Sequence, residues 1–180
     1  MIIDASMAFG TGKHPTTQGC LIAISKLKNK KIKNVLDLGC GTSILSIATK
    51  KKFYCSNMVA IDVDPIALSI SKSNSILNNI SGFQIKLRKS SKYVVRIGKH
   101  KIKYNLILAN ISHDVLIKMA KDIFLNLHGD GTLIVSGIYL NKFREVNNWF
   151  YKYKFIVIKC IIINNWITLV LKKRSINANK

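Results

Sequence analysis

Two short segments, about twenty residues apart, carry residue types that suit the binding of a nucleotide-like ligand. Residues 35 to 43 read V-L-D-L-G-C-G-T-S, an apolar run that passes into a glycine-rich turn, and residues 59 to 62 form a second apolar run that ends at Asp62. A glycine turn lets the backbone approach a ligand closely, and a carboxylate at the end of the next strand accepts hydrogen bonds from both hydroxyls of a ribose. The spacing therefore predicts a cofactor pocket.

The glycines of this turn favour one kind of cofactor over another. A dinucleotide fingerprint, G-x-G-x-x-G, would place its third glycine at residue 44, which is isoleucine, and the turn holds no basic residue to meet a phosphate. Gly39 and Gly41 instead suit a ligand with an adenosine and a zwitterionic amino-acid tail, because neither has a Cβ that would keep the ligand away. The alternative is an ordinary strand, turn and helix that binds nothing.

Residues 8 to 17, A-F-G-T-G-K-H-P-T-T, form another candidate binding segment. A phosphate-binding P-loop would need glycine at position 7 and serine or threonine at position 14, where this chain has Met7 and His14. The segment offers a glycine-containing loop, with Thr16 and Thr17 as candidate N-caps of an apolar helix. Hydroxyls and backbone donors there could contact the carboxylate of an amino-acid tail. The alternative is a plain capped helix.

The apolar run of residues 104 to 109 stops at a polar side chain, Asn110. Ligands of open α/β sheets bind beyond the carboxyl ends of the strands, so this side chain is predicted to lie beside the reactive end of the cofactor. Its amide could orient an incoming nitrogen there. A cap of the helix that begins near His113 is an equally good interpretation of the same residue.

The elements that must position these segments alternate along the chain. The pattern predicts helices over residues 17–28, 43–52, 65–79, 113–127 and 142–151, and strands over 34–38, 57–62, 83–87, 104–109, 131–136, 153–163 and 166–173. Gly129, Asp130 and Gly131 are expected to end the fourth helix, and residues 88 to 103 to cross the surface. This order predicts an α/β fold with a Rossmann-like, mostly parallel sheet that ends in an antiparallel strand pair.

Five stretches, taken in order, resemble one known family. They are A-F-G-T-G-K-H-P-T-T, V-L-D-L-G-C-G-T-S-I-L-S-I-A, A-I-D-V-D-P-I-A-L, L-A-N-I and L-I-V-S-G-I. The second resembles motif I of the class I S-adenosylmethionine methyltransferases, usually D-x-G-x-G-x-G, with Ser43 in place of the third glycine. Together, from about Asp4 to the end of the chain, they resemble the bacterial methyltransferase of large-ribosomal-subunit protein eleven, the PrmA family. The first stretch is the most specific, because its features are not general to methyltransferases.

The resemblance implies a protein-lysine N-methyltransferase that uses S-adenosyl-L-methionine, has the class I methyltransferase sheet, and acts on lysine side chains and the N-terminal amino group of the ribosomal protein. The cofactor-binding residues expected from the resemblance and from the glycine turn are Thr17, Gly39, Gly41, Asp62 and Asn110. Ala5 and Ser6 replace the usual Pro-Gly, and Ser112 replaces the usual leucine near the chemistry. Ser112 therefore bears on substrate fit more than on cofactor binding.

Methyl transfer to an amine depends mostly on alignment and desolvation, because a sulfonium already activates the methyl group. A lysine with a pKa of ~10.4 is almost fully charged at neutral pH and must lose its proton. A low-dielectric pocket lowers that pKa, and the Asn110 amide or the Ile111 carbonyl could hold the neutral nitrogen. No catalytic residue is assigned. Histidine is a common general base, which makes His14 a candidate, but a histidine beside proline is more often structural.

The length and composition fit one domain with a substantial core, since 48% of the 180 residues are hydrophobic. We expect a methyltransferase domain over residues 1–174 and a disordered tail over 175–180. The resemblance implies a further N-terminal domain that grips the ribosomal protein, and we expect it to be absent because the sequence starts almost at the first catalytic motif. A natural short form, a piece of a split gene and an enzyme that finds its target by other surfaces remain open.

The charge is strongly basic, with 29 Lys and Arg against 8 Asp and Glu, a formal net charge of +21. Such a surface could favour encounter with ribosomes or RNA through counterion release. The abundance of Lys, Asn and Ile along the whole chain equally fits an AT-biased genome, and no aromatic residues interleave the basic runs to stack on bases. Both interpretations remain open.

Cysteine and hydropathy patterns bear on location. Four cysteines without C-x-x-C spacing or flanking histidines predict neither a metal site nor a disulfide framework, and they suit reduced thiols of a cytoplasmic protein. No secretory signal is evident at the start. The most apolar stretch, residues 155 to 171, is broken by Lys159 and by Asn164-Asn165, so no membrane span is predicted.

Three functions remain open from sequence: a protein amine methyltransferase, an RNA methyltransferase of the same fold, and a remnant that binds cofactor without turnover. Many RNA base-amine enzymes carry N-P-P-Y or D-P-P-Y at the end of the fourth strand, where the aromatic side chain stacks on the flipped base. Residues 110 to 113 read N-I-S-H, without the prolines or the aromatic residue. This difference favours the protein methyltransferase.

Overall fold

The computed structural model describes residues 1–4, 10–28, 31–80, 86–89 and 103–174. Its strands are β1 (Asn34–Leu38), β2 (Asn57–Asp62), β3 (Lys86–Lys89), β4 (Tyr104–Asn110), β5 (Leu127–Tyr139), β6 (Phe155–Ile163) and β7 (Trp166–Lys173). Its helices are α1 (Pro15–Lys26), α2 (Ile44–Lys52), α3 (Pro65–Leu77), α4 (His113–Asn126) and α5 (Phe143–Lys152), with a short 3-10 turn, η1 (Leu140–Lys142), before α5.

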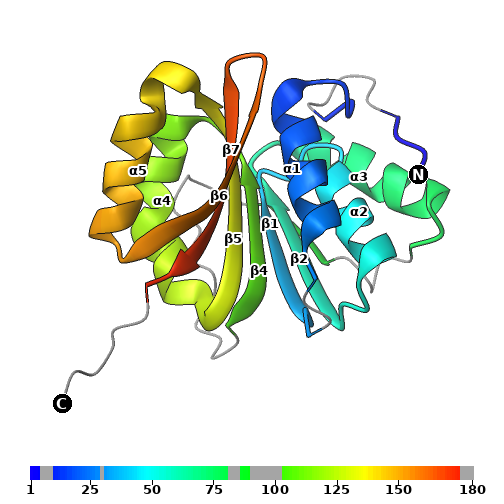
Figure 1. Ribbon diagram of the computed structural model, residues 1–180. Coiled ribbons are helices and arrows are strands. Elements are labelled where there is room, and N and C mark those ends of the chain that lie inside the picture. Colours follow the sequence, from blue (N-terminus) through cyan, green and yellow to red (C-terminus); the bar gives the residue numbers. More distant parts are fainter. Residues whose placement is uncertain (5–9, 29–30, 81–85, 90–102, 175–180) are drawn as a thin grey trace.

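The strands form a seven-stranded sheet in the order β3-β2-β1-β4-β5-β7-β6. The first five strands pair in parallel, and β7 runs antiparallel to both β5 and β6. Helices α1, α2 and α3 cover one face of the sheet and α4 and α5 cover the other (Figure 1). The predicted fold class is confirmed: a mostly parallel Rossmann-like sheet that ends in an antiparallel pair.

Alternating side chains of the central strands divide the core into two halves. In β4, Leu106 and Leu108 pack with α1 and α2 on one face, whereas Ile107 and Ala109 pack with α4 and α5 on the other. All four are completely buried, as expected for a strand covered on both faces. On α4 the buried residues are Leu116, Met119, Ala120 and Ile123, a spacing that places them on one side of a helix.

The helix starts follow local capping chemistry, with one difference from expectation. Asp64 caps α3 by accepting a hydrogen bond from the backbone N–H of Ile66 at 2.8 Å, and Pro65 occupies the first helical position as predicted. The prediction that Thr16 or Thr17 caps the first helix is wrong. The N-cap is His14, and the helix already begins at Pro15, because the proline ring fixes a helical φ and no donor is needed there.

The expected helix end at Gly129 to Gly131 is also wrong. Helix α4 ends at Asn126, and β5 has begun by Leu127, whose buried side chain anchors the strand beside Tyr104 of β4. The glycines lie within the strand, near a register shift in its pairing with β4. The closing hairpin matches expectation, and Asn164 and Asn165 both take the positive φ of a tight turn.

Some expectations concern residues beyond the described ones. Strand β3 covers residues 86–89, whereas the expected strand over 83–87 lies mostly outside the described residues, as do most of the expected surface crossing and the tail over 175–180. Among the described residues, none of the helices has the length and apolarity needed to cross a bilayer.

Candidate active site

A cavity of about 650 Å³ opens beyond the carboxyl ends of β1, β2 and β4. The chain moves outward from β1 to β2 and β3 and then returns to β4 on the other side, so the cavity lies where the strand order reverses. Its volume is that of a small-molecule site. The lining residues are His14, Thr16, Leu38, Gly39, Gly41, Ile61, Asp62, Val63, Asn110, Ile111, Ser112, His113, Val115, Met119, Gly137, Tyr139 and Trp166.

The turn after β1 approaches the segment after β4 very closely. Gly39 has a φ of +68°, and a Cβ at this position would lie 2.4 Å from Cγ2 of Ile111. The backbone N–H groups of Gly39 and Cys40 both donate to the carbonyl of Ile61, at 2.8 and 3.1 Å. Only glycine fits this position, because a side chain would collide with Ile111 in a backbone conformation that L residues rarely adopt.

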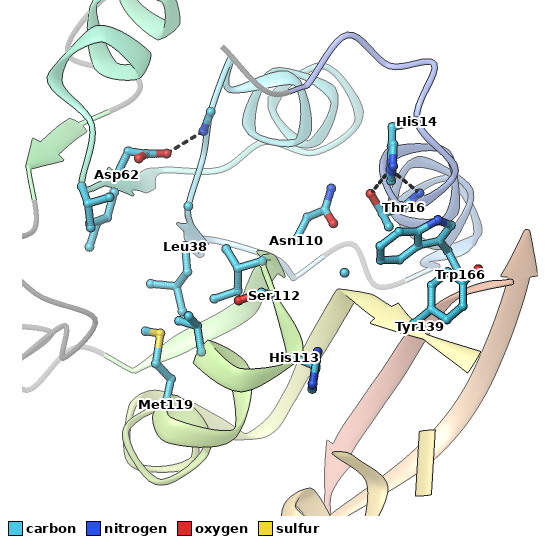
Figure 2. Close-up of a pocket in the computed structure, with 17 residues that line it drawn as sticks. His14, Thr16, Leu38, Asp62, Asn110, Ser112, His113, Met119, Tyr139 and Trp166 are labelled. Carbon is cyan, nitrogen blue, oxygen red and sulfur yellow. Dashed lines mark hydrogen bonds between the residues drawn. The ribbon is translucent and has the colours of Figure 1, made fainter. Parts of the chain in front are cut away.

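Asp62 is held in a fixed orientation at one end of the cavity (Figure 2). Its Oδ2 accepts a hydrogen bond from the backbone N–H of Gly41 at 2.9 Å, and its Oδ1 accepts one from the backbone N–H of Asp64 at 3.0 Å. A carboxylate has about four lone-pair sites, so both oxygens can accept further hydrogen bonds from a ligand.

Asn110 lines the cavity, but Thr17 does not. The side chain of Thr17 is completely buried, and its Oγ1 accepts a long hydrogen bond of 3.4 Å from Nδ2 of Asn110. Thr17 therefore supports Asn110 from behind, while the neighbouring Thr16 reaches the lining. Of the five residues expected to bind cofactor, the structure brings Gly39, Gly41, Asp62 and Asn110 around the cavity and places Thr17 one side chain away.

Tyr139 and Trp166 are the aromatic lining residues that the sequence argument did not identify. They are partners in the β5 and β7 pairing, and they meet at the same edge of the sheet as Asn110. Tyr139 ends a parallel strand, so the rule that located Asn110 could also have located Tyr139. Trp166 begins an antiparallel strand, and finding it requires knowing that such a strand presents its first residue at this edge.

The described residues include no group of three or more His, Cys, Asp or Glu side chains that could hold a metal ion. All four cysteines are free thiols, with Cys20, Cys40 and Cys55 buried and Cys160 exposed. Burial raises the pKa of the Cys20 and Cys40 thiols to about 12, so both stay protonated at neutral pH.

Asp37 lies buried beneath the glycine turn. Its Oδ2 accepts a hydrogen bond of 2.6 Å from Oγ of Ser46, while its Oδ1 is buried without a hydrogen-bond partner. Burial raises the pKa of this carboxyl to about 6, although the Ser46 hydrogen bonds oppose the rise. Between the ordinary pKa of 3.8 and about 6 the folded protein therefore holds a proton that the unfolded chain has released.

This proton makes stability depend on pH. Asp37 should lower the free energy of unfolding as pH rises through this window, by at most about 1.4 kcal/mol per pH unit, and Asp37→Asn should remove that contribution. Urea denaturation of both proteins between pH 4 and 7 measures the difference, since every other titrating group is shared. Parallel pH profiles for the two proteins would show that the Asp37 carboxyl has an ordinary pKa.

Comparisons with known proteins agree on one family. The model of the family described as "Ribosomal protein L11 methyltransferase (PrmA)" matches residues 1–174. Relatives named ribosomal protein L11 methyltransferase include those of Agrobacterium fabrum, 39% identical over 95% of this chain and 58% of theirs, and of Nitratiruptor, 38% identical over 94% and 56%. The chain thus spans about half the length of these curated relatives.

Solved structures show the same fold. The crystal structure of a ribosomal protein L11 methylase from Lactobacillus delbrueckii subsp. bulgaricus superposes with a TM-score of 0.84 at 27% identity, and covers 96% of this chain and 84% of that one. A precorrin-6y methyltransferase from Geobacter metallireducens superposes with a TM-score of 0.76 at 13% identity over 97% of both chains. At that low identity the second match shows the fold alone.

Proposed function

Because the chain belongs to the ribosomal protein L11 methyltransferase family, PrmA, we propose that it transfers methyl groups from S-adenosyl-L-methionine to amino groups of a large-subunit ribosomal protein. The acceptors would be lysine side chains and the N-terminal amine. The observation that carries this proposal is the cavity at the point where the strand order reverses. Asp62 lies at one end of this cavity, and Asn110 lines it from the carboxyl end of β4. Residues 1–174, which match the family model, would form the methyltransferase domain.

The residues around the cavity fit the cofactor. Gly39, which has no Cβ, lets Ile111 pack directly against the turn, so the turn and the segment after β4 together form the floor of the cavity. Asp62 presents two oriented oxygens to a ribose diol, and the apolar side chains of Leu38, Ile61 and Val63 suit an adenine ring nearby. The cofactor supplies a sulfonium-activated methyl group, and transfer forms an N–C bond as the C–S bond breaks.

The protein's part in the reaction is to bind, align and dehydrate. Asn110 sits between the Asp62 end and the opposite wall of the cavity, so its amide would orient the acceptor nitrogen. The largely apolar lining excludes water and lowers the pKa of an entering lysine, which favours the neutral amine that attacks. A ribosomal substrate also implies that the protein works in the cytoplasm, where its basic surface would aid encounter with ribosomes.

The experiment that tests this proposal is radiolabelled methyl transfer to ribosomes that lack the modification and to the free ribosomal protein. The proposal predicts label that survives nuclease and is lost with protease. Label lost with nuclease would instead establish an RNA methyltransferase. Cofactor binding by calorimetry without label on either substrate would identify a remnant without turnover.

Asn110→Ala should slow methyl transfer more than it destabilises the fold. The loss of one hydrogen bond to the reacting nitrogen, about 1 kcal/mol, lowers the rate about five- to tenfold. Asn126→Ala is a matched control, because Asn126 also donates a side-chain hydrogen bond, to the carbonyl of Asp122 at 2.8 Å, but lies at the far end of α4. Single-turnover rates measure the effect on methyl transfer, and urea denaturation measures the effect on stability. Equal transfer rates for the two variants would show that Asn110 takes no part in the reaction.

A further inference from the structure

Three ring side chains meet at one end of the cavity. The rings of Tyr139 and Trp166 pack edge to face, with centroids 5.1 Å apart at 88°, and the ring of His14 packs against Trp166 with centroids 5.2 Å apart at 65°. All three line the cavity, and they come from β5, β7 and the start of α1. We call this group, His14, Tyr139 and Trp166, the aromatic wall.

The aromatic wall lies away from the Asp62 end of the cavity. Figure 2 shows Asp62 on one side, the aromatic wall on the other, and Asn110 between them. If Asp62 receives the ribose, the sulfonium and the acceptor amine must lie toward Asn110 and the wall. Tyr139 is 43% exposed, so a lysine side chain can reach the rings from solvent.

The cavity lining offers few acidic side chains that could bind a cation. Among the described lining residues Asp62 is the only carboxylate, and it stands at the other end. Asp114 follows Asn110 by four residues in the sequence, but it does not line the cavity. Its Oδ1 lies 3.3 Å from Nε2 of His113. In a chain with a net charge of +21, positive charge that forms on an amine in this cavity therefore meets few compensating charges. Ring faces carry partial negative charge and attract ammonium groups.

We propose that the aromatic wall receives the nitrogen of the methyl acceptor and binds the positive charge that forms on it, in the transition state and in the methylated products, through the faces of Tyr139 and Trp166. This inference rests on the proposed function and extends it to the second substrate. Positive charge leaves the sulfur and develops on the nitrogen during transfer, so rings beside the nitrogen stabilise the transition state more than the neutral amine. Each added methyl group keeps the product cationic and enlarges its contact with the rings.

His14 acts in the wall as a positioning residue. Its Nδ1 lies 2.8 Å from Oγ1 of Thr16 at the start of α1, which fixes the plane of the imidazole. The fixed ring supports Trp166, which is thus held by ring contacts to both His14 and Tyr139. His14 therefore has two roles: it caps α1, and its ring lines the cavity beside Trp166.

The first test measures binding without turnover. Saturation-transfer NMR with tetramethylammonium as the probe, in the presence and absence of S-adenosylhomocysteine, should show binding to the wild-type chain. The signal should fall at least about fivefold in Trp166→Leu and Tyr139→Leu, and Trp166→Phe should retain part of it because a ring face remains. Tyr54→Leu is the matched control, since Tyr54 is 94% exposed and lies outside the cavity lining.

Absence of probe binding to the wild type, or equal binding by Trp166→Leu and Tyr54→Leu, would overturn the proposal. The second test is kinetic: Trp166→Leu should lower kcat/KM for the ribosomal protein about five- to thirtyfold and leave the calorimetric Kd of S-adenosylhomocysteine unchanged. A changed cofactor Kd with unchanged acceptor kinetics would assign the wall to the cofactor instead. A wild type that binds the probe but transfers no methyl group would contradict the proposed function and leave the wall as an ammonium site.

Discussion

Asp62→Ala is expected to weaken the binding of S-adenosyl-L-methionine by about ten- to one-hundredfold, the loss of charge-assisted hydrogen bonds worth about 1.5 to 3 kcal/mol. The geometry explains the size of the effect. The carboxylate is already oriented by the backbone N–H groups of Gly41 and Asp64, so a ribose diol would meet acceptors that need no rearrangement. Removing this side chain also leaves the Gly41 N–H without its partner at the edge of the cavity.

Asp64→Ala is the matched control for this prediction. Asp64 lies two residues after Asp62, beyond the end of β2. Its side chain is exposed and does not line the cavity. Its side chain caps α3, so the substitution should lower the free energy of unfolding by about 1 kcal/mol and leave cofactor affinity unchanged. Calorimetry on both variants measures the contrast, and equal affinities for Asp62→Ala and the wild type would show that the cofactor binds elsewhere.

Gly137→Ala is expected to destabilise the fold by about 2 to 5 kcal/mol or to displace the segment after β4. Gly137 has a φ of +85°, and a Cβ there would lie 2.1 Å from the carbonyl oxygen of Ile111. The obstacle is backbone, so neither rotation of a side chain nor a small shift can relieve it. Because Ile111 follows Asn110, any backbone adjustment that does occur should also reduce methyl transfer.

Gly129→Ala is the matched control for Gly137→Ala. Gly129 lies in the same strand, but a Cβ there would meet no atom within 4 Å. This substitution should change the free energy of unfolding by less than about 0.5 kcal/mol, as for most surface positions. Urea denaturation of the two variants, followed by cofactor calorimetry on any that fold, measures the difference. Equal stability of Gly137→Ala and Gly129→Ala would show that β5 and Ile111 do not pack as closely as the structure has them.

The sequence predicted the sheet well because its signals there are local. The apolar runs of β1 and β2 were located to the residue, since each run is short, fully buried and bounded by polar or glycine residues. The error at the end of α4 occurred where tertiary packing overrode a local signal. Gly129 and Gly131 suggested a helix end, but the helix ends earlier, at Asn126, because β5 begins at the buried Leu127.

The candidate site was predictable in part for the same reason. Gly39, Gly41 and Asp62 are close in sequence, and Asn110 marks a strand end, so pattern and topology were enough to group them around one cavity. The position of Thr17 behind Asn110 depends on the rotation of α1 against the sheet, which no local pattern encodes. The aromatic wall joins residues from three distant segments, and only the paired register of β5 and β7 brings Tyr139 and Trp166 together.

The proposal that this chain methylates amino groups of a ribosomal protein can be tested on the substrate itself. Its most direct test is intact-mass and peptide mass spectrometry of the unmodified ribosomal protein after incubation with the chain and S-adenosyl-L-methionine. We expect whole methyl increments on lysine or N-terminal peptides, retained in Asp64→Ala and strongly reduced in Asp62→Ala when the cofactor concentration is near the wild-type Kd. An unmodified protein under conditions where calorimetry shows bound cofactor would contradict the claim.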